Sequence, residues 1–274
     1  MIAQDRETTV AVIGAGVMGE TLLSGLIRAG RRPEDLLVVE KRRERAAELE
    51  ERYGVEVVAN TDAARRAGTL ALVVKPQDMG DVLDELASVV RPGQLVVSLA
   101  AGITTAFIEA RLPDEVAVVR VMPNTPALVD EGMAAISRGS HCDESHLVEA
   151  ESLMASTGRV IQVPERQQDA VTAISGSGPG YIFFVVEAMI EAGVHLGLPR
   201  STAAELVVQT LVGSAKLLRE TGEHPVVLRE RVTSPGGTTA AALRELEDHK
   251  VRAAFLGAIE AARDRSRALA EGLG

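Results

Sequence analysis

The sequence predicts an α/β fold, in which a Rossmann-like, mostly parallel sheet domain is followed by an all-α C-terminal dimerisation domain. From Val10 to about Val163, short β-branched runs alternate with alanine-rich or charged stretches of helical length, which is typical of parallel strands joined by crossover helices. A glycine-rich turn follows the first run, and after Pro164 the β-branched runs stop. We therefore expect a dinucleotide-binding domain over residues 1–163 and an all-helical dimerisation and substrate-binding domain over residues 164–274.

Eight strands are expected in the first domain, because each of eight short runs is apolar and mostly β-branched. They are placed near residues 10–13, 36–39, 55–58, 70–74, 95–99, 116–121, 133–137 and 160–163. The segments between most of these runs have the length and composition of helices, so the sheet is expected to be mostly parallel.

The glycine-rich turn comes directly after the first expected strand, in TTVAVIGAGVMGE. Gly14, Gly16 and Gly19 have G-x-G-x-x-G spacing and lead into a helical pattern over residues 21–29. In dinucleotide-binding folds these glycines permit the tight turn, the approach of a pyrophosphate and the packing of helix on strand. The alternative is a tight strand-to-helix turn without a ligand. We predict a cofactor loop that comprises Gly14, Gly16, Val17, Met18 and Gly19.

The end of the second expected strand carries two conflicting signals for the nucleotide. Glu40 lies about twenty residues past the glycines, where a carboxylate binds the ribose 2′-hydroxyl of NAD. Lys41, Arg42, Arg43 and Arg45 follow immediately and would suit the 2′-phosphate of NADP. A solvated helix start is the alternative explanation of the basic cluster. We expect Glu40, Lys41 and Arg42 to bind the cofactor, with NADPH favoured and NADH as the alternative.

Two further strand ends are expected at the cofactor, because ligands of open α/β sheets bind beyond the carboxyl ends of strands. The first is VVKPQ, with Val74, Lys75 and Pro76, and the second is RVMPNTP, with Met122, Pro123 and Asn124. Ordinary turn chemistry is the alternative for both.

An unusually apolar helix is expected over residues 181–196, where the polar side chains are Glu187, Glu191 and His195 at four-residue spacing. These three form one narrow stripe, so most of the helix circumference must be buried. A subunit interface would bury it, and a central helix wrapped by its own neighbours is the alternative.

Serine, threonine and glycine gather at two expected helix starts, in DAVTAISGSGPGY and VTSPGGTTAAALREL. Helix N-termini offer free amides and positive potential to anions, whereas simple N-capping is the alternative. We predict substrate-binding residues at both starts, namely Ser175, Gly176, Ser177, Gly236, Gly237, Thr238 and Thr239, where a threonine hydroxyl can also hydrogen-bond a reacting nitrogen or oxygen.

Composition argues against several other classes of protein. The formal net charge is −10 and aromatic residues make up 2%, which disfavours a nucleic-acid partner. Apolar runs end before the roughly 18–20 residues of a membrane span and no signal peptide is evident, so no membrane association and a cytoplasmic location are expected. Cys142 is the single cysteine, and the histidines are scattered, so no metal site is predicted.

Taken together, the motifs resemble the pyrroline-5-carboxylate reductase family. GAGVMG, VVKPQ, VSLAAGIT, VRVMPNTPALV, DAVTAISGSGPGY, GLPR and VTSPGGTTAAALRELE follow that family's order from end to end. The resemblance implies an N-terminal Rossmann domain, a helical domain that intertwines with a second subunit, and dimers that often assemble into decamers. It implies that NADPH is the usual cofactor, with Asn60 near the adenosine ribose phosphate and Ala100 among the cofactor residues. It also implies that Thr239 is the catalytic residue, which bonds the substrate nitrogen, and that the loop from Ser234 through Gly237 holds the substrate carboxylate. Glu223 matches an acidic residue common before the His-Pro pair.

The expected reaction is hydride transfer from C4 of the reduced nicotinamide to the imine carbon of pyrroline-5-carboxylate, giving L-proline. One rival is a hydroxyacid dehydrogenase, which would need a lysine acid/base, and Lys216 and Lys250 are the lysines after Pro164. The other rival is a non-catalytic NADP-sensing protein that keeps the Rossmann loop without turnover.

Overall fold

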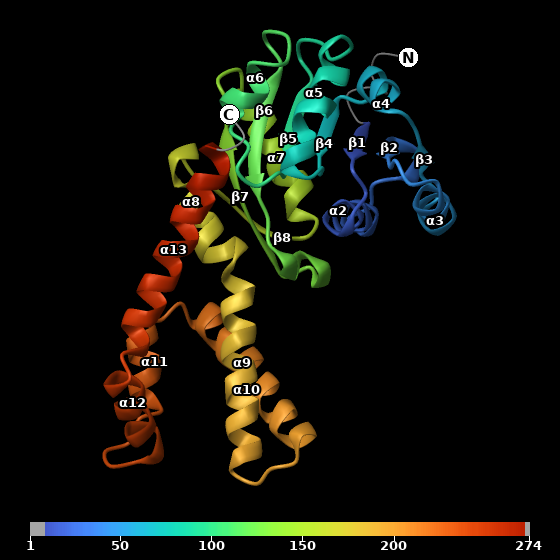
Figure 1. Cartoon of the computed structure of the whole chain (residues 1–274). Coiled ribbons are helices and arrows are strands. Elements are labelled where there is room, and N and C mark those ends of the chain that lie inside the picture. The colour runs from blue at the N-terminus through green and yellow to red at the C-terminus, as the bar shows by residue number, and fades with distance from the viewer. Residues whose placement is uncertain (1–8, 272–274) are drawn as a thin grey trace. The chain divides into compact units, whose positions relative to one another are not determined.

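The computed structural model describes residues 9–271, and these form two compact units (Figure 1). The first unit contains the described residues up to Ser177 together with those from Ala262 on, and the second is Gly178–Ala261. The chain thus returns to the first unit at its end. The functional division into residues 1–163 and 164–274 stays a prediction.

The first unit is built on one eight-stranded sheet, in the order β3-β2-β1-β4-β5-β6-β7-β8. The strands are β1 (Val10–Ile13), β2 (Leu36–Val39), β3 (Glu56–Val57), β4 (Thr69–Leu72), β5 (Leu95–Ser98), β6 (Ala117–Met122), β7 (Gly132–Arg138) and β8 (Gly158–Gln162). Every neighbouring pair is parallel except β6 and β7, which are antiparallel. The eight predicted strands are confirmed, with ends shifted by at most two residues.

Helices cover both faces of this sheet, as Figure 1 shows. They are α2 (Val17–Arg28), α3 (Arg43–Tyr53), α4 (Asn60–Arg66), α5 (Met79–Ala87), α6 (Thr105–Glu109) and α7 (Glu144–Ala155), with 3-10 turns at Pro33–Asp35, Pro76–Asp78, Thr125–Val129 and Glu165–Gln167. Successive strand residues point to opposite faces, so Val10 and Val12 join one buried cluster while Ala11 and Ile13 join another. The sheet therefore has a core on each face, which fixes the strand ends that carry the predicted site.

The second unit is all-helical, and a helical connection leads into it. The connection is α8 (Gln168–Val171) and a π-helical turn (Thr172–Gly176), followed by α9 (Gly178–His195), α10 (Arg200–Thr221), α11 (Pro225–Arg231), α12 (Thr238–Asp248) and α13 (Val251–Glu271). The all-α class predicted for this part of the chain is confirmed. α13 begins in the second unit and its last turns belong to the first.

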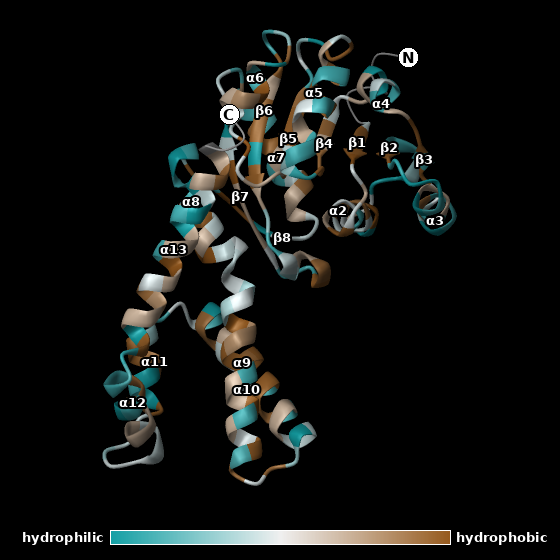
Figure 2. Cartoon of the chain, in the orientation of Figure 1, coloured by the Kyte–Doolittle hydropathy of each residue, from teal (hydrophilic) through white to brown (hydrophobic). Residues whose placement is uncertain are grey.

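Almost nothing in the second unit is buried within the single chain. Ala203 is the one buried residue described there, and no residue of α9 is buried. Phe183 and Phe184 are 66% and 71% exposed, and Figure 2 shows the hydrophobic segments on α9 and α10. The alternative of a central helix wrapped by its own neighbours is therefore wrong, because those neighbours leave its apolar surface uncovered.

One helical stretch, Glu165–His195, is long and apolar enough to cross a membrane by length and composition alone. Its apolar side chains include those that α9 leaves exposed, and a face that packs on another protein surface has the same composition.

Candidate active site

The glycine-rich turn has the geometry that its sequence predicts. Gly14 has φ +96°, and a Cβ there would lie 2.8 Å from the carbonyl oxygen of Val73. A Cβ on Gly19 would overlap the carbonyl of Gly14, whereas Gly16 has open space around it. Gly16 is also the N-cap of α2, and no side chain caps the first amides of this helix. Those amides are thus left for a ligand, and the open space at Gly16 lets a ligand approach the backbone closely.

A cavity of about 460 Å³ lies at the carboxyl ends of β1, β2 and β4. This is where the strand order changes direction between β1 and β4, the usual place for a dinucleotide. Eight predicted cofactor residues line it together: Gly14, Gly16, Glu40, Lys41, Arg42, Asn60, Val74 and Lys75. The sequence had placed them on four separate segments.

Glu40 and Arg42 form a bonded pair in the wall of this cavity. The Glu40 carboxylate accepts hydrogen bonds from the backbone amide of Arg42 at 3.0 Å and from its Nε at 3.1 Å. Burial raises the pKa of Glu40, but the hydrogen bonds and charge of Arg42 outweigh it, so the pKa is lowered overall. Glu40 therefore stays ionised as a hydrogen-bond acceptor, and Arg42 is held beside it.

Of the other basic residues, Lys41 lines the cavity, whereas Arg45 forms ion pairs within the protein. The partners of Arg45 are Glu20 and Glu48, the latter at 3.0 Å. Arg45 thus supports α2 and α3, and the cationic residues that line the cavity floor beside Glu40 are Lys41 and Arg42.

Asn60 begins α4 and is 7% exposed. Its Nδ2 donates to Glu85 at 2.6 Å, while its buried Oδ1 has no hydrogen-bond partner in residues 9–271. A buried carbonyl oxygen without a donor is costly, so a hydroxyl or amide of a bound nucleotide would compensate. The set of acceptors, cations and open amides in this wall fits a nicotinamide dinucleotide.

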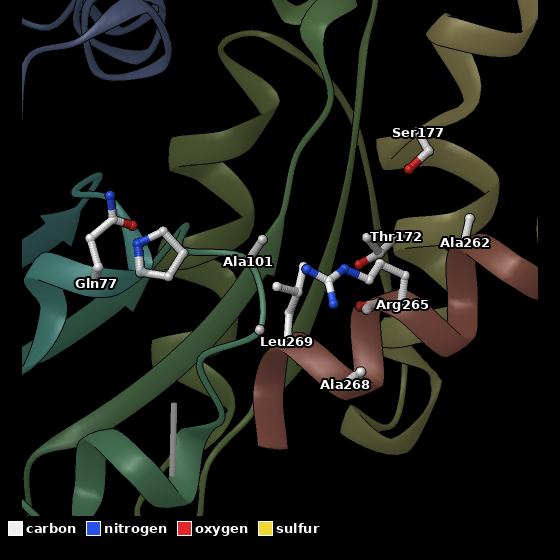
Figure 3. A pocket seen from close by; sticks show the side chains of 11 residues that line it. Gln77, Ala101, Thr172, Ser177, Ala262, Arg265, Ala268 and Leu269 are labelled. Carbon is white, nitrogen blue, oxygen red and sulfur yellow. The ribbon is translucent and has the colours of Figure 1, made fainter. Parts of the chain in front are cut away.

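A second cavity, of about 570 Å³, lies entirely in the first unit (Figure 3). It is lined by Pro76, Gln77, Ala101, Gly102, Thr172, Ser177, Ala262, Arg265, Ser266, Ala268 and Leu269. Pro76 directly follows Lys75, which lines the first cavity, so the segment after β4 contributes residues to both cavities. Of the predicted residues, Pro76 and Ser177 line this space. Sequence reasoning missed both Gln77 and Arg265. Gln77 ends the VVKPQ motif but was given no role, and Arg265 stands in no recognisable motif.

Two predicted motifs meet beside this cavity, where the end of β6 lies against the end of the π-helical turn. Nδ2 of Asn124 donates to the hydroxyl of Ser175 at 3.2 Å, and Oδ1 accepts from the Met133 amide at 2.8 Å. A Cβ on Gly176 would overlap the Met122 side chain. The Asn124 amide is therefore occupied within the protein, where it positions the Ser175 turn.

The segment around Ser177 is not a free helix start. α8 and the π-helical turn precede it, and the Ser177 amide donates to the Thr172 carbonyl at 2.8 Å, five residues back. The amide of Ser177 is thus already hydrogen-bonded within the protein, and its hydroxyl is the Ser177 donor that remains for a ligand of the cavity.

Seven predicted cofactor residues line neither of the two cavities: Val17, Met18, Gly19, Ala100, Met122, Pro123 and Asn124. Val17 is 70% exposed, Met18 packs against one core cluster, Ala100 is buried in the other, and Pro123 lines a separate narrow crevice. Their roles stay predictions.

The other predicted substrate residues lie in the second unit. Gly236 has φ +70°, and the Gly237 amide donates to the Ser234 carbonyl at 3.0 Å, which closes a tight turn. Gly237 is the N-cap of α12 and no side chain caps it, so N-capping by Ser or Thr, the alternative, is wrong here. The amides of Thr238 and Thr239 begin the helix and are open to an anion.

Two charged residues of the second unit have protein partners. Lys216 is exposed on α10 and lies 3.7 Å from Glu220, while Glu223 is ion-paired with Arg231 at 2.5 Å. Lys216 therefore looks like an ordinary solvated lysine.

Comparison with known proteins decides the family. Residues 165–269 match the model described as pyrroline-5-carboxylate reductase dimerisation, and residues 9–102 match that described as NADP oxidoreductase, coenzyme F420-dependent. A pyrroline-5-carboxylate reductase of Corynebacterium melassecola is 46% identical over 96% of this chain and 98% of its own length. The chain belongs to the pyrroline-5-carboxylate reductase family.

Solved structures agree. The Coxiella burnetii pyrroline-5-carboxylate reductase has a TM-score of 0.92 and 38% identity, covering 96% of this chain and 98% of its own. The Plasmodium falciparum pyrroline carboxylate reductase, a structure with NADP bound, has a TM-score of 0.86 and 28% identity, covering 97% and 99%. The family resemblance seen in the motifs is thus confirmed. The chain is an NAD(P)H-dependent oxidoreductase, with a dinucleotide-binding sheet domain and a dimerisation domain built from the uncovered helices.

Proposed function

We propose that this chain reduces 1-pyrroline-5-carboxylate to L-proline, the last step of proline biosynthesis, in the cytoplasm. The observation that carries the proposal is the 46% identity to a pyrroline-5-carboxylate reductase over nearly the whole of both chains. The cavity at the β1–β4 switch point, lined by eight predicted cofactor residues, and the uncapped turn before α12 support it.

The cofactor proposed is NADPH, with NADH as a second donor. Gly14, Gly16 and the start of α2 would hold the pyrophosphate, and Lys41 and Arg42 would hold the 2′-phosphate. Glu40 would accept from the ribose hydroxyls of NADH. The bound nicotinamide supplies the hydride that reaches the imine carbon. Further proposed cofactor residues are Val17, Met18, Gly19, Asn60, Val74, Lys75, Pro76, Ala100, Met122, Pro123 and Asn124.

The substrate is already activated when its imine nitrogen is protonated, so the protein needs to supply alignment and charge complementarity. We assign the carboxylate to the turn formed by Ser234, Gly236, Gly237 and Thr238, and the ring nitrogen to the Thr239 hydroxyl. Ser175, Gly176 and Ser177 would complete the substrate wall. A homodimer is the minimal unit, and dimers assemble further into decamers.

The test of the reaction is spectrophotometric. Purified protein is expected to oxidise NADPH, and NADH more weakly, when pyrroline-5-carboxylate is added. Activity with hydroxyacids and NAD(P)⁺ in place of this reaction would instead support a hydroxyacid dehydrogenase. Tight NADPH binding without imine-dependent oxidation would support a non-catalytic nucleotide sensor.

Thr239→Val tests the catalytic assignment, because it removes the hydroxyl while keeping the side-chain shape. We expect kcat/KM for the imine to fall by an amount equivalent to about 1–3 kcal/mol, the scale for one good hydrogen bond. Thr210→Val, which removes an exposed threonine hydroxyl of α10 outside the predicted site, is the control. Unchanged efficiency in Thr239→Val would remove this hydroxyl from the site.

A further inference from the structure

The last turns of α13 carry three arginines at two-residue spacing, and one of them differs from the others. Arg263 donates to Asp264 at 2.9 Å, and Arg267 lies 3.8 Å from Asp169. Arg265 makes no ion pair and no hydrogen bond to any residue in the described part of the chain. A guanidinium remains charged in a protein and carries five N–H donors, so Arg265 has its full binding capacity unused.

The Arg265 side chain lines the 570 Å³ cavity, and Figure 3 shows it extending from α13 into that space. The other polar side chains of the lining are neutral: Gln77, Thr172, Ser177 and Ser266. The remaining lining residues are Gly, Ala, Pro and Leu. Arg265 is thus the one charged group among the described lining residues. Arg265 is exposed, so an anion that enters the cavity can reach its guanidinium without displacing a protein partner.

The part of α13 that follows Arg265 is anchored to the rest of the first unit. The Ser266 hydroxyl donates to Asp169 of α8 at 2.8 Å, and Ser266 is 7% exposed. Further along α13, Ala270 lies against the turn at Gly102, where a Cβ would be 3.6 Å from the Ala270 backbone. The arginine therefore projects from a fixed helix end, which is what a binding residue requires.

The cavity lies where the reacting groups of this fold are expected. Its wall includes Pro76 and Ala101, which follow β4 and β5 at the edge where ligands of such sheets bind. Pro76 also continues from the cofactor cavity through Lys75. A volume of about 570 Å³ exceeds what a single five-membered imino acid needs and would hold a nicotinamide ring as well.

We propose that Arg265 is a substrate-binding residue, whose guanidinium holds the carboxylate of the cyclic imino acid in this cavity. The proposal rests on the proposed function, because it takes the cyclic imino acid as the ligand of this cavity. A carboxylate offers about four acceptor positions, so a guanidinium can bind it through two parallel N–H donors.

Arg265→Gln is the decisive variant. We expect KM for pyrroline-5-carboxylate to rise about 10- to 100-fold, the range for hydrogen bonds to a charged group. KM for NADPH and kcat should change by less than about twofold, because the guanidinium acts on the substrate carboxylate alone. Arg265→Lys should recover part of the loss, since it restores the charge without the bidentate fork. Arg263→Gln, two residues away and outside the cavity lining, is the matched control.

A substrate without the carboxylate separates binding from structural support. 1-Pyrroline has the same imine ring, so Arg265→Gln should leave its kcat/KM at the wild-type value while lowering that for pyrroline-5-carboxylate. Equal losses with both imines would mean that Arg265 only supports the fold, and would overturn the proposal. An unchanged KM for pyrroline-5-carboxylate would overturn it as well.

Ligand-induced thermal stabilisation gives a readout that needs no turnover. L-Proline should raise the Tm of the wild-type protein more than pyrrolidine does, and Arg265→Gln should abolish that difference. Absence of imine reduction by the wild-type chain would refute the proposed function by itself. A proline-specific Tm shift that survives in Arg265→Gln would refute the arginine site by itself.

Discussion

The sheet unit and the helical unit use apolar residues in opposite ways. In the first unit the strands β1, β2, β4 and β5 are buried at every position, and two clusters fill the two faces of the sheet. In the second unit Ala203 is the one buried residue among those described, although most side chains of α9 are apolar. The first unit folds around its own side chains. The second keeps its apolar surface for another chain.

The difference follows from how each element meets its neighbours. A central parallel strand has helices on both sides, so a run such as VAVI is covered within one chain. α9 packs closely on α10, where a Cβ on Gly193 would lie 2.9 Å from the Ala203 side chain. That contact covers one side of α9 and leaves Phe183 and Phe184 exposed. Covering the rest takes a second copy, in agreement with the match to a dimerisation model.

Of the variants considered, Phe184→Glu should have the largest effect, because it should disrupt the dimer. Placing a charge on the uncovered face of α9 is expected to raise the dimer dissociation constant at least about 100-fold, equivalent to about 2.7 kcal/mol. NADPH binding, followed by nucleotide fluorescence, should change by less than about twofold, because the first unit has its own core. Sedimentation velocity across a concentration series measures the dimer.

Ser88→Glu, at the exposed end of α5, adds the same charge to the first unit and should leave the dimer intact. A Phe184→Glu protein that stays dimeric, or one that loses nucleotide binding together with the dimer, would contradict the separation of the two units.

Sequence patterns predicted the sheet well because strand burial is a local property. Each β-branched run appears as a strand, and Gly14 and Gly19 occupy positions that a Cβ would not fit. The position of Arg265 in a cavity could not be predicted, because an arginine within RDRSR on a charged helix is usually part of a solvent-exposed helix face. Its place depends on α13 returning to the first unit, which no local pattern encodes. The internal use of Asn124 was equally hidden, since its partners Ser175 and Met133 are distant in sequence.

Glu40→Ser sharpens the comparison within the first unit, whose residues alone line the proposed nucleotide cavity. The variant removes a carboxylate that would repel a 2′-phosphate and releases Arg42 to bind it. The ratio of kcat/KM for NADPH to that for NADH should rise about tenfold, equivalent to about 1.4 kcal/mol. Arg42→Ala should shift the ratio in the opposite direction. Equal ratios in all three proteins would exclude this pair from nucleotide selection.

The pH dependence of that ratio gives a second check. The pKa of Glu40 is lowered, because bonding to Arg42 outweighs the rise from burial, so the carboxylate is charged at all pH values above its usual pKa. Its contribution to stability is present above the unfolded-state pKa and is lost only as pH falls through the lower folded-state value. Between about pH 6 and 8, Glu40 should therefore leave the NADPH-to-NADH ratio flat. A step in this range that disappears in Glu40→Ser would show that the carboxylate titrates there after all.

Lys216→Ala should have the smallest effect of all, and it tests the rival chemistry. A hydroxyacid dehydrogenase would depend on a lysine acid/base in its second half, and loss of that group would cost orders of magnitude in kcat. Lys216 is 63% exposed and its partner Glu220 is 62% exposed, an i,i+4 pair on the surface of α10. Such pairs contribute less than about 0.5 kcal/mol, so the variant should keep its imine reductase activity and its Tm within about two degrees. Because hydride transfer to a protonated imine needs no lysine, a fall in kcat by tenfold or more in Lys216→Ala would favour the dehydrogenase mechanism over the one proposed here.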